Sequence, residues 1–109
     1  MRKYITKKGQ EKLLKEIIIS GFKVVITGIF AYPLSREWLG KTLTLKTVRE
    51  LVKLKKRYGI SPSGEGGEIE TTVLDAPFFQ KRIEVQEFEV KAKENSGVFI
   101  IKDAKLVEK

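Results

Sequence analysis

Three carboxylates lie in a glycine-rich segment near the middle of the chain, and they give the clearest chemical signal in the sequence. Residues 64–71 read Gly-Glu-Gly-Gly-Glu-Ile-Glu-Thr. Three glycines in four positions let the backbone approach a ligand closely and present several N–H groups to it. Clustered carboxylates at Glu65, Glu68 and Glu70 favour a cation: a metal ion, an ammonium group or a positively charged substrate. The alternative is a hairpin-entry loop with solvated carboxylates, and the composition supports the two interpretations about equally.

The second half of this segment is predicted to be a strand, in which alternate side chains point to opposite faces of the sheet. Glu68, Glu70 and Thr72 then share one face, and residues 69, 71 and 73 take the other. Asp75 follows the strand and precedes Ala-Pro. It is a candidate catalytic acid, but an Asp in this position more often forms a turn.

The chain contains no His and no Cys. This inventory excludes disulfide scaffolds, thiolate metal sites, cysteine nucleophiles, serine–histidine hydrolysis and zinc proteases. Because transition metals are usually held by His and Cys, a hard ion such as Mg²⁺ is the only metal that the carboxylates suggest. Any chemistry must therefore use carboxylates, hydroxyls, Lys, Arg, backbone groups or residues of a partner.

Two aromatic residues, Tyr32 and Trp38, lie in a loop over residues 31–41 that follows a predicted strand. Together they could form a stacking platform for a base or a clamp for a quaternary ammonium group. The interpretation that we prefer is a Trp that covers a small core. In the same loop, Gly40-Lys41-Thr42 is not a phosphate-binding loop, because Ser35 stands where that motif needs its first glycine.

A small number of elements must position these residues. Apolar spacing predicts one helix from about residue 6 or 8 to 19 and another over 45–58. The apolar, β-branched run at 22–30 is typical of a strand covered on both faces, as in a parallel sheet with helices on each side. Further strands are predicted at 68–74, 81–90 and 98–107, the last two antiparallel. We expect one α/β domain over residues 1–109, with about two main helices and a small mixed sheet that has a parallel strand first and antiparallel strands at its carboxy-terminal end.

Several element boundaries can be predicted from single residues. Gly21 is placed to end the first helix, and Thr47-x-x-Glu50 matches a capping box for the second. The apolar parity of the strand at 81–90 changes after Val85, which indicates a bulge near residues 86–87. We expect residues 78–79, both Phe, to return to the core.

The net charge of +8 is unevenly distributed. Residues 1–60 hold 15 basic and 4 acidic side chains, whereas residues 61–109 hold 7 basic and 10 acidic ones. We favour solvated cations on helix faces as the explanation, with the basic cluster at 53–57 matched to the dipole of a helix end. The alternative is attraction to a polyanion such as RNA or a nucleotide.

The sequence favours a soluble, cytoplasmic protein. No apolar stretch follows the basic start, so no secretory signal is predicted. The longest apolar run, at 24–34, is far shorter than the ~20 residues of a membrane span. Abundant Lys and Glu with no Cys and one Met are typical of a thermophile.

The carboxylate segment also carries a family resemblance. Residues 64–79, which read GEGGEIETTVLDAPFF, closely resemble the signature of diphthine–ammonia ligases of the ATP-pyrophosphatase (adenine nucleotide alpha-hydrolase) superfamily. Residues 21–28, Ala31-Tyr32 and Trp38-Leu39-Gly40 resemble the preceding strand and loop of that family in order and spacing. Pro33, Lys41 and Ile69 depart from its pattern, which affects the expected shape of the Trp38 loop.

The resemblance implies an enzyme that adenylates the carboxylate of diphthine, a modified His on elongation factor 2, with ATP. Ammonia then displaces AMP and forms the amide of diphthamide. Family members carry a Ser-Gly-Gly-Lys-Asp-Ser pyrophosphate loop in their amino-terminal half, and this sequence has no such string. The chain resembles the carboxy-terminal half alone, which helps to form the substrate side of the cleft. The resemblance places these residues at the substrate: Glu65, Gly66, Gly67, Glu68, Glu70, Thr71, Trp38 and Tyr32.

Two hypotheses about function follow. In the first, the chain is the substrate-binding part of the ligase and is inactive alone, with ATP bound mainly by a missing or separate ATP-pyrophosphatase subunit and Mg²⁺ as a further candidate cofactor. Elongation factor 2 is then the substrate, and the exposed apolar face of an isolated half favours association, including homo-oligomers. In the second, the chain is a non-catalytic RNA- or protein-binding module.

Overall fold

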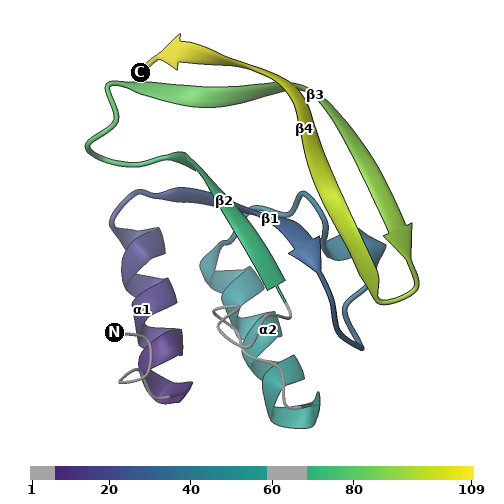
Figure 1. The fold of residues 1–109 in the computed structure, drawn as a ribbon. Helices are drawn as coiled ribbons and strands as arrows, with labels where there is room; N and C mark the ends of the chain where they lie inside the picture. Colours follow the sequence, from purple (N-terminus) through teal and green to yellow (C-terminus); the bar gives the residue numbers. More distant parts are fainter. Residues whose placement is uncertain (1–6, 59–68) are drawn as a thin grey trace.

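The computed structural model describes residues 7–58 and 69–109, which form a small mixed α/β structure (Figure 1). Two helices and a four-stranded sheet make up this part of the chain, with the sheet order β2-β1-β4-β3. In chain order the elements are α1 (Lys7–Ile19), β1 (Lys23–Ile29), the 3-10 helix η2 (Arg36–Trp38), α2 (Leu45–Tyr58), β2 (Ile69–Asp75), β3 (Lys81–Lys93) and β4 (Ser96–Glu108). The predicted mixed α/β class with two helices is confirmed.

The end of α1 is set by Gly21, as predicted. The Phe22 N–H donates to the Ile17 carbonyl at 3.3 Å, and the Gly21 N–H donates to the Ile18 carbonyl at 3.1 Å. This pair of bonds is the Schellman arrangement, which needs a residue in the left-handed region, and Gly21 has a φ of 96°. The chain therefore turns directly from α1 into β1.

The start of α2 differs from the predicted capping box. The helix begins at Leu45, and the Thr44 hydroxyl accepts the Thr47 N–H at 3.1 Å, so Thr44 is the N-cap. Thr47 lies inside the first turn, where its hydroxyl donates to the Thr42 carbonyl at 3.2 Å. The prediction with Thr47 and Glu50 placed the cap one turn too late, because both Thr residues match the preference for a hydroxyl at this position.

The expected parallel pairing of the first strand is not confirmed, because β1 runs antiparallel to both of its neighbours. One edge pairs with β2 along the whole strand. The other edge is shared: Lys41 and Leu43 bond to the first half of β1, and Gly97 and Val98 of β4 pair with its last two residues. The carboxy-terminal end of β1 is thus held between the start of β2 and the start of β4.

The core lies between one face of the sheet and the two helices (Figure 1). Its fully buried side chains come from β1, from the loop after it and from α2: Ile26, Ile29, Leu34, Val48 and Leu51. Each contributes about 1.5–3 kcal/mol through removal of apolar surface from water.

The bent β3–β4 hairpin covers the face of β1 and β2 that lies opposite the helices. Its register shifts on either side of Glu87, which confirms the predicted bulge, and the hairpin bends so that its far half arches back over the sheet (Figure 1). Phe88 and Phe99 stack at 4.6 Å between ring centroids, and they line a small groove together with Val25 and Leu74. β1 is therefore covered on both faces, as its apolar run predicted, but by helices on one side and a hairpin on the other.

The connection between β2 and β3 does not return to the core as expected. Phe78 is 75% exposed and lies edge-on to Phe22, with 6.0 Å between the ring centroids. The Lys109 ammonium holds this connection, because it pairs with the Asp75 carboxylate at 2.9 Å and donates to the Ala76 carbonyl at 2.9 Å.

Candidate functional site

Glu70, one of the predicted site residues, lies at the end of the sheet where β1 ends and β2 begins. Gly28 pairs with Glu70, and Ile29 pairs with Ile69. A register shift between Ile26 and Gly28 marks a bulge in β1. The bulge leaves Ile29 in the core and turns Gly28 to the face opposite the helices, the face that Glu70 shares.

Gly28 brings a carboxylate and an aromatic ring together. A Cβ atom at Gly28 would lie 2.9 Å from the Phe30 ring and 3.0 Å from the Glu70 Cβ. Any side chain at this position would therefore push one of them away, since such distances are too short for carbon contacts. The glycine allows Phe30 and Glu70 to lie on either side of one backbone position.

A groove of about 630 Å³ is lined by Phe30, the aromatic member of this pair. Phe30, Ala31 and Tyr32 form one wall, and the tip of the β3–β4 hairpin forms the other with Lys93, Glu94, Asn95 and Ser96. The Asn95 amide donates to the Leu34 carbonyl at 2.8 Å and so fastens the tip to the loop. The groove is thus built from segments more than 60 residues apart in sequence.

Glu70 is exposed and makes no hydrogen bond or ion pair with any residue in the described ranges. Its carboxylate is consequently available to a ligand. Thr72, on the same face, bonds to the Thr27 hydroxyl at 3.0 Å and is thus engaged within the sheet. Thr71 is also exposed, but the alternation of β2 points it to the other face, so Glu70 and Thr71 do not converge.

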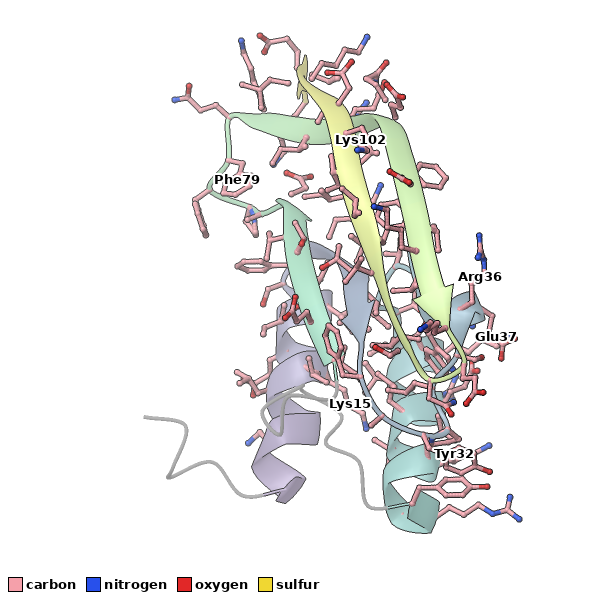
Figure 2. All side chains as sticks on the ribbon, turned by 45° about the vertical axis from the view of Figure 1, so that its right-hand side comes forward. Lys15, Tyr32, Arg36, Glu37, Phe79 and Lys102 are labelled. Atoms are coloured by element: carbon pink, nitrogen blue, oxygen red, sulfur yellow. The ribbon has the colours of Figure 1, made fainter. Side chains whose placement is uncertain are left out.

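Tyr32 projects from the loop after β1, beside the last turn of α2 (Figure 2). It is 65% exposed, and its ring meets that of Tyr58 edge-on at 5.3 Å. One face of a large aromatic ring is therefore open at the mouth of the groove.

Trp38 has a different environment. It is 7% exposed and belongs to the core, and the Lys41 ammonium lies 4.7 Å from the centroid of its ring. A cation of the chain itself thus faces the indole, where the sequence suggested a ligand. A contact between Trp38 and the substrate stays a prediction.

The other predicted residues, Glu65, Gly66, Gly67 and Glu68, lie outside the described ranges. Ile69 is the first described residue after them, and it pairs with Ile29 at the groove end of the sheet. Within residues 7–58 and 69–109, no group of three acidic side chains is arranged to hold a metal ion.

Asp75 lies at the far end of β2, away from this groove. Its carboxylate accepts the Ala76 N–H at 2.9 Å, which is the turn geometry expected for an Asp before Ala-Pro. The hydrogen bond and charge of Lys109 hold the Asp75 pKa below its ordinary value. Asp75 therefore acts in the described structure as a charged anchor of the connection to β3.

Sequence reasoning missed Phe30 and the hairpin tip. Phe30 reads as the last residue of an apolar strand, and residues 93–96 read as an ordinary turn. The structure itself marks the hairpin tip, because Glu94 has a φ of 38°, in a region that residues other than Gly and Asn rarely adopt. The pairing of Ile29 with Gly97, which brings the tip to the groove, has no local sequence signature.

Comparison with known proteins gives a consistent result. A family model described as diphthamide synthase C-terminal domain matches residues 9–107. The diphthine–ammonia ligase of Schizosaccharomyces pombe is 41% identical over 87 residues, which are 80% of this chain and 14% of the relative. The diphthine–ammonia ligase of Homo sapiens is 42% identical over 88 residues, which are 80% of this chain and 33% of the relative. The chain therefore spans a third or less of the length of these relatives.

In the part of the chain that the structure describes, neither helix is long and apolar enough to cross a membrane.

Proposed function

Because the chain belongs to the diphthamide synthase C-terminal domain family, we propose that it supplies the substrate-binding part of a diphthine–ammonia ligase in diphthamide biosynthesis. The observation that carries this proposal is a family match over residues 9–107 together with an open groove lined by Phe30, whose ring borders the same Gly28 position as Glu70. The substrate is diphthine on elongation factor 2, and the reaction takes place where that factor works, in the cytoplasm.

The reaction has two steps. The diphthine carboxylate attacks the α-phosphate of ATP, which releases pyrophosphate and leaves an acyl adenylate. Ammonia then attacks the acyl carbon, and AMP leaves with the electron pair of the broken C–O bond. Both steps need the substrate carboxyl group held steadily toward the nucleotide, which is a positioning task.

The groove supports recognition of the trimethylammonium group that diphthine carries. Aromatic faces attract such cations, by about 0.5–2 kcal/mol each, and Phe30 and Tyr32 are both more than 40% exposed at this groove. Glu70, which makes no ion pair with any described residue, adds a carboxylate next to Phe30. That Glu65, Gly66, Gly67, Glu68, Thr71 and Trp38 also take part in substrate binding stays a prediction.

ATP is assigned to another part of the enzyme. The sequence has no Ser-Gly-Gly-Lys-Asp-Ser loop, and the chain corresponds to a third or less of its relatives. We therefore assign ATP, and any Mg²⁺ that accompanies its phosphates, to a separate or missing amino-terminal half. The isolated 109-residue chain should not adenylate diphthine, and detectable adenylation would refute the assignment of ATP to another part of the enzyme.

The test is amidation of diphthine-bearing elongation factor 2 by the chain together with the rest of the ligase. Glu70→Gln should lower kcat/KM at least about tenfold, which corresponds to ~1.4 kcal/mol of lost transition-state stabilisation. Glu87→Gln is the matched control, because Glu87 is also exposed, on β3, and is distant in register from the groove. Equal activity of both variants would show that Glu70 is a solvated surface residue and does not bind the substrate.

A further inference from the structure

The most exposed side of α2 is cationic, and the one carboxylate of this helix, Glu50, is half-buried at the edge of that side. Lys46, Arg49, Lys53 and Lys56 recur every three or four residues, and all four are exposed. With Arg57 they occupy an arc of about 100° of the helix, opposite its buried side. We call these five residues the basic stripe, and it extends about 16.5 Å along the helix axis at 1.5 Å per residue.

The dipole of the helix does not account for this stripe. Cations are favourable in the last turn, near Lys56 and Arg57, but unfavourable in the first turns, where Lys46 and Arg49 lie. The first turn of α2 contains no acidic residue. None of the first four cations makes an ion pair with any described residue, and Glu50 is the single carboxylate among these residues of α2.

An aromatic platform continues the stripe at the carboxy-terminal end of α2. The Arg57 guanidinium lies 5.9 Å from the centroid of the Tyr58 ring, and Tyr58 meets Tyr32 edge-on at 5.3 Å. Both tyrosines are well exposed, by 43% and 65%. A row of cations that ends in open aromatic rings is the combination that single-stranded nucleic acids use, with phosphates on the cations and bases on the rings.

We propose that the basic stripe and the Tyr58–Tyr32 platform form a binding site for single-stranded nucleic acid, which borders the proposed substrate groove at Tyr32 but is not needed for amidation. The cations contact about four successive phosphates, and a base stacks on the platform. An acidic protein would match the charge of the stripe but would leave the tyrosines without a partner, which is why nucleic acid is the occupant favoured here. Solvated lysines alone would explain neither the platform nor the cations in the first turns.

The test measures binding of the full 109-residue chain to a fluorescently labelled, 12-nucleotide single-stranded RNA of mixed sequence, by anisotropy at several salt concentrations. Four phosphate contacts on a single strand predict a slope of log K against log salt of about −2.8. Affinity should thus fall about 50-fold between 50 and 200 mM salt. No binding at 50 mM salt, or binding of polyglutamate as tight as that of the RNA, would overturn the proposal.

Two variants separate the site from the general positive charge of the protein. Arg49→Gln with Lys53→Gln removes two contacts and should reduce the slope to about −1.4. The matched control is Lys91→Gln with Lys105→Gln, which removes the same charge from exposed positions on the hairpin and should leave the slope near −2.8. Equal slopes for the two double variants would show that net charge alone is responsible, and would refute the site.

The platform is tested at Tyr58, because Tyr32 also lines the substrate groove. Tyr58→Ala should weaken binding about 5-fold or more, as expected for loss of base stacking, with an unchanged salt slope because no phosphate contact is lost. Phe78→Ala removes a still more exposed ring, from the connection between β2 and β3, and should have no effect. A 12-base-pair duplex should bind less tightly than the single strand, and equal affinity would refute stacking. None of these outcomes depends on amidation, so the site and the ligase function succeed or fail separately.

Discussion

The hydrogen bond between the Asn95 amide and the Leu34 carbonyl should be the main fastening of the candidate groove. The two groups lie 2.8 Å apart, and Leu34 itself is fully buried. Asn95→Ala removes the donor and leaves a carbonyl in a partly buried place without its protein partner. Loss of a buried hydrogen bond in this way costs about 1–2 kcal/mol. For a chain of this size, that corresponds to a decrease of roughly 4–8 °C in Tm.

The assay is urea and thermal unfolding followed by circular dichroism, with Gln86→Ala as the control. Gln86 also donates an amide hydrogen bond at 2.8 Å, to Glu84, but this bond is exposed on β3. Its loss should change the free energy of unfolding by less than about 0.5 kcal/mol. If both variants unfold at the same urea concentration as the wild type, the hairpin tip is not fastened to the loop and the groove is not a built feature.

Three further predictions concern the site, the core and the charged anchor. Gly28→Ala should lower the rate of amidation at least about tenfold and lower the free energy of unfolding by less than about 1.5 kcal/mol. The reason is that the exposed Phe30 ring can swing away from a Cβ at 2.9 Å but then leaves the groove. Normal activity of the variant would contradict this prediction. Leu51→Ala should destabilise the fold by about 2–5 kcal/mol, measured by urea unfolding, since Leu51 is fully buried beneath the sheet. The hydrogen bond and charge of Lys109 lower the Asp75 pKa. This ion pair therefore stabilises the fold above about pH 4, and its contribution is lost as the pH falls through the Asp75 pKa of the folded state. Asp75→Asn should therefore be less stable at pH 7 and show a smaller loss of stability toward acid, and parallel pH profiles would contradict the anchor.

Elements whose residues repeat locally were predictable from sequence. The bounds of α2 follow from its amphipathic spacing, because the cations and the apolar residues separate onto opposite sides of one helix. The bulge at Glu87 follows from the change of apolar parity along β3. The stop at Gly21 follows from the absence of a side chain at a left-handed position.

The arrangement of the sheet was not predictable in the same way. The apolar run of β1 correctly indicated a strand buried on both faces, and helices on both faces were the usual explanation. Here the second face is covered instead by the bent β3–β4 hairpin, whose Phe88 and Phe99 lie over Val25. That geometry depends on a bulge and on long-range pairing, which composition does not encode locally.

The residues of the candidate site show the same difference between local and long-range features. Glu70 was found because its carboxylate stands in a glycine-rich signature, and Tyr32 because it follows a strand end. Phe30 and Asn95 were missed because their roles arise only when the hairpin tip meets the loop after β1. Local chemistry was visible in the sequence, whereas the second wall of the groove required the fold.

The central claim is that this chain is needed to convert diphthine to diphthamide. The most direct measurement is the mass of the modified His peptide from elongation factor 2, purified from the native host after deletion of the region that encodes this chain. If the chain acts as proposed, the peptide stops at the diphthine acid in the deletion strain. The wild-type chain then restores the amide, whereas Glu70→Gln restores much less of it. Full conversion to diphthamide in the deletion strain would contradict the account.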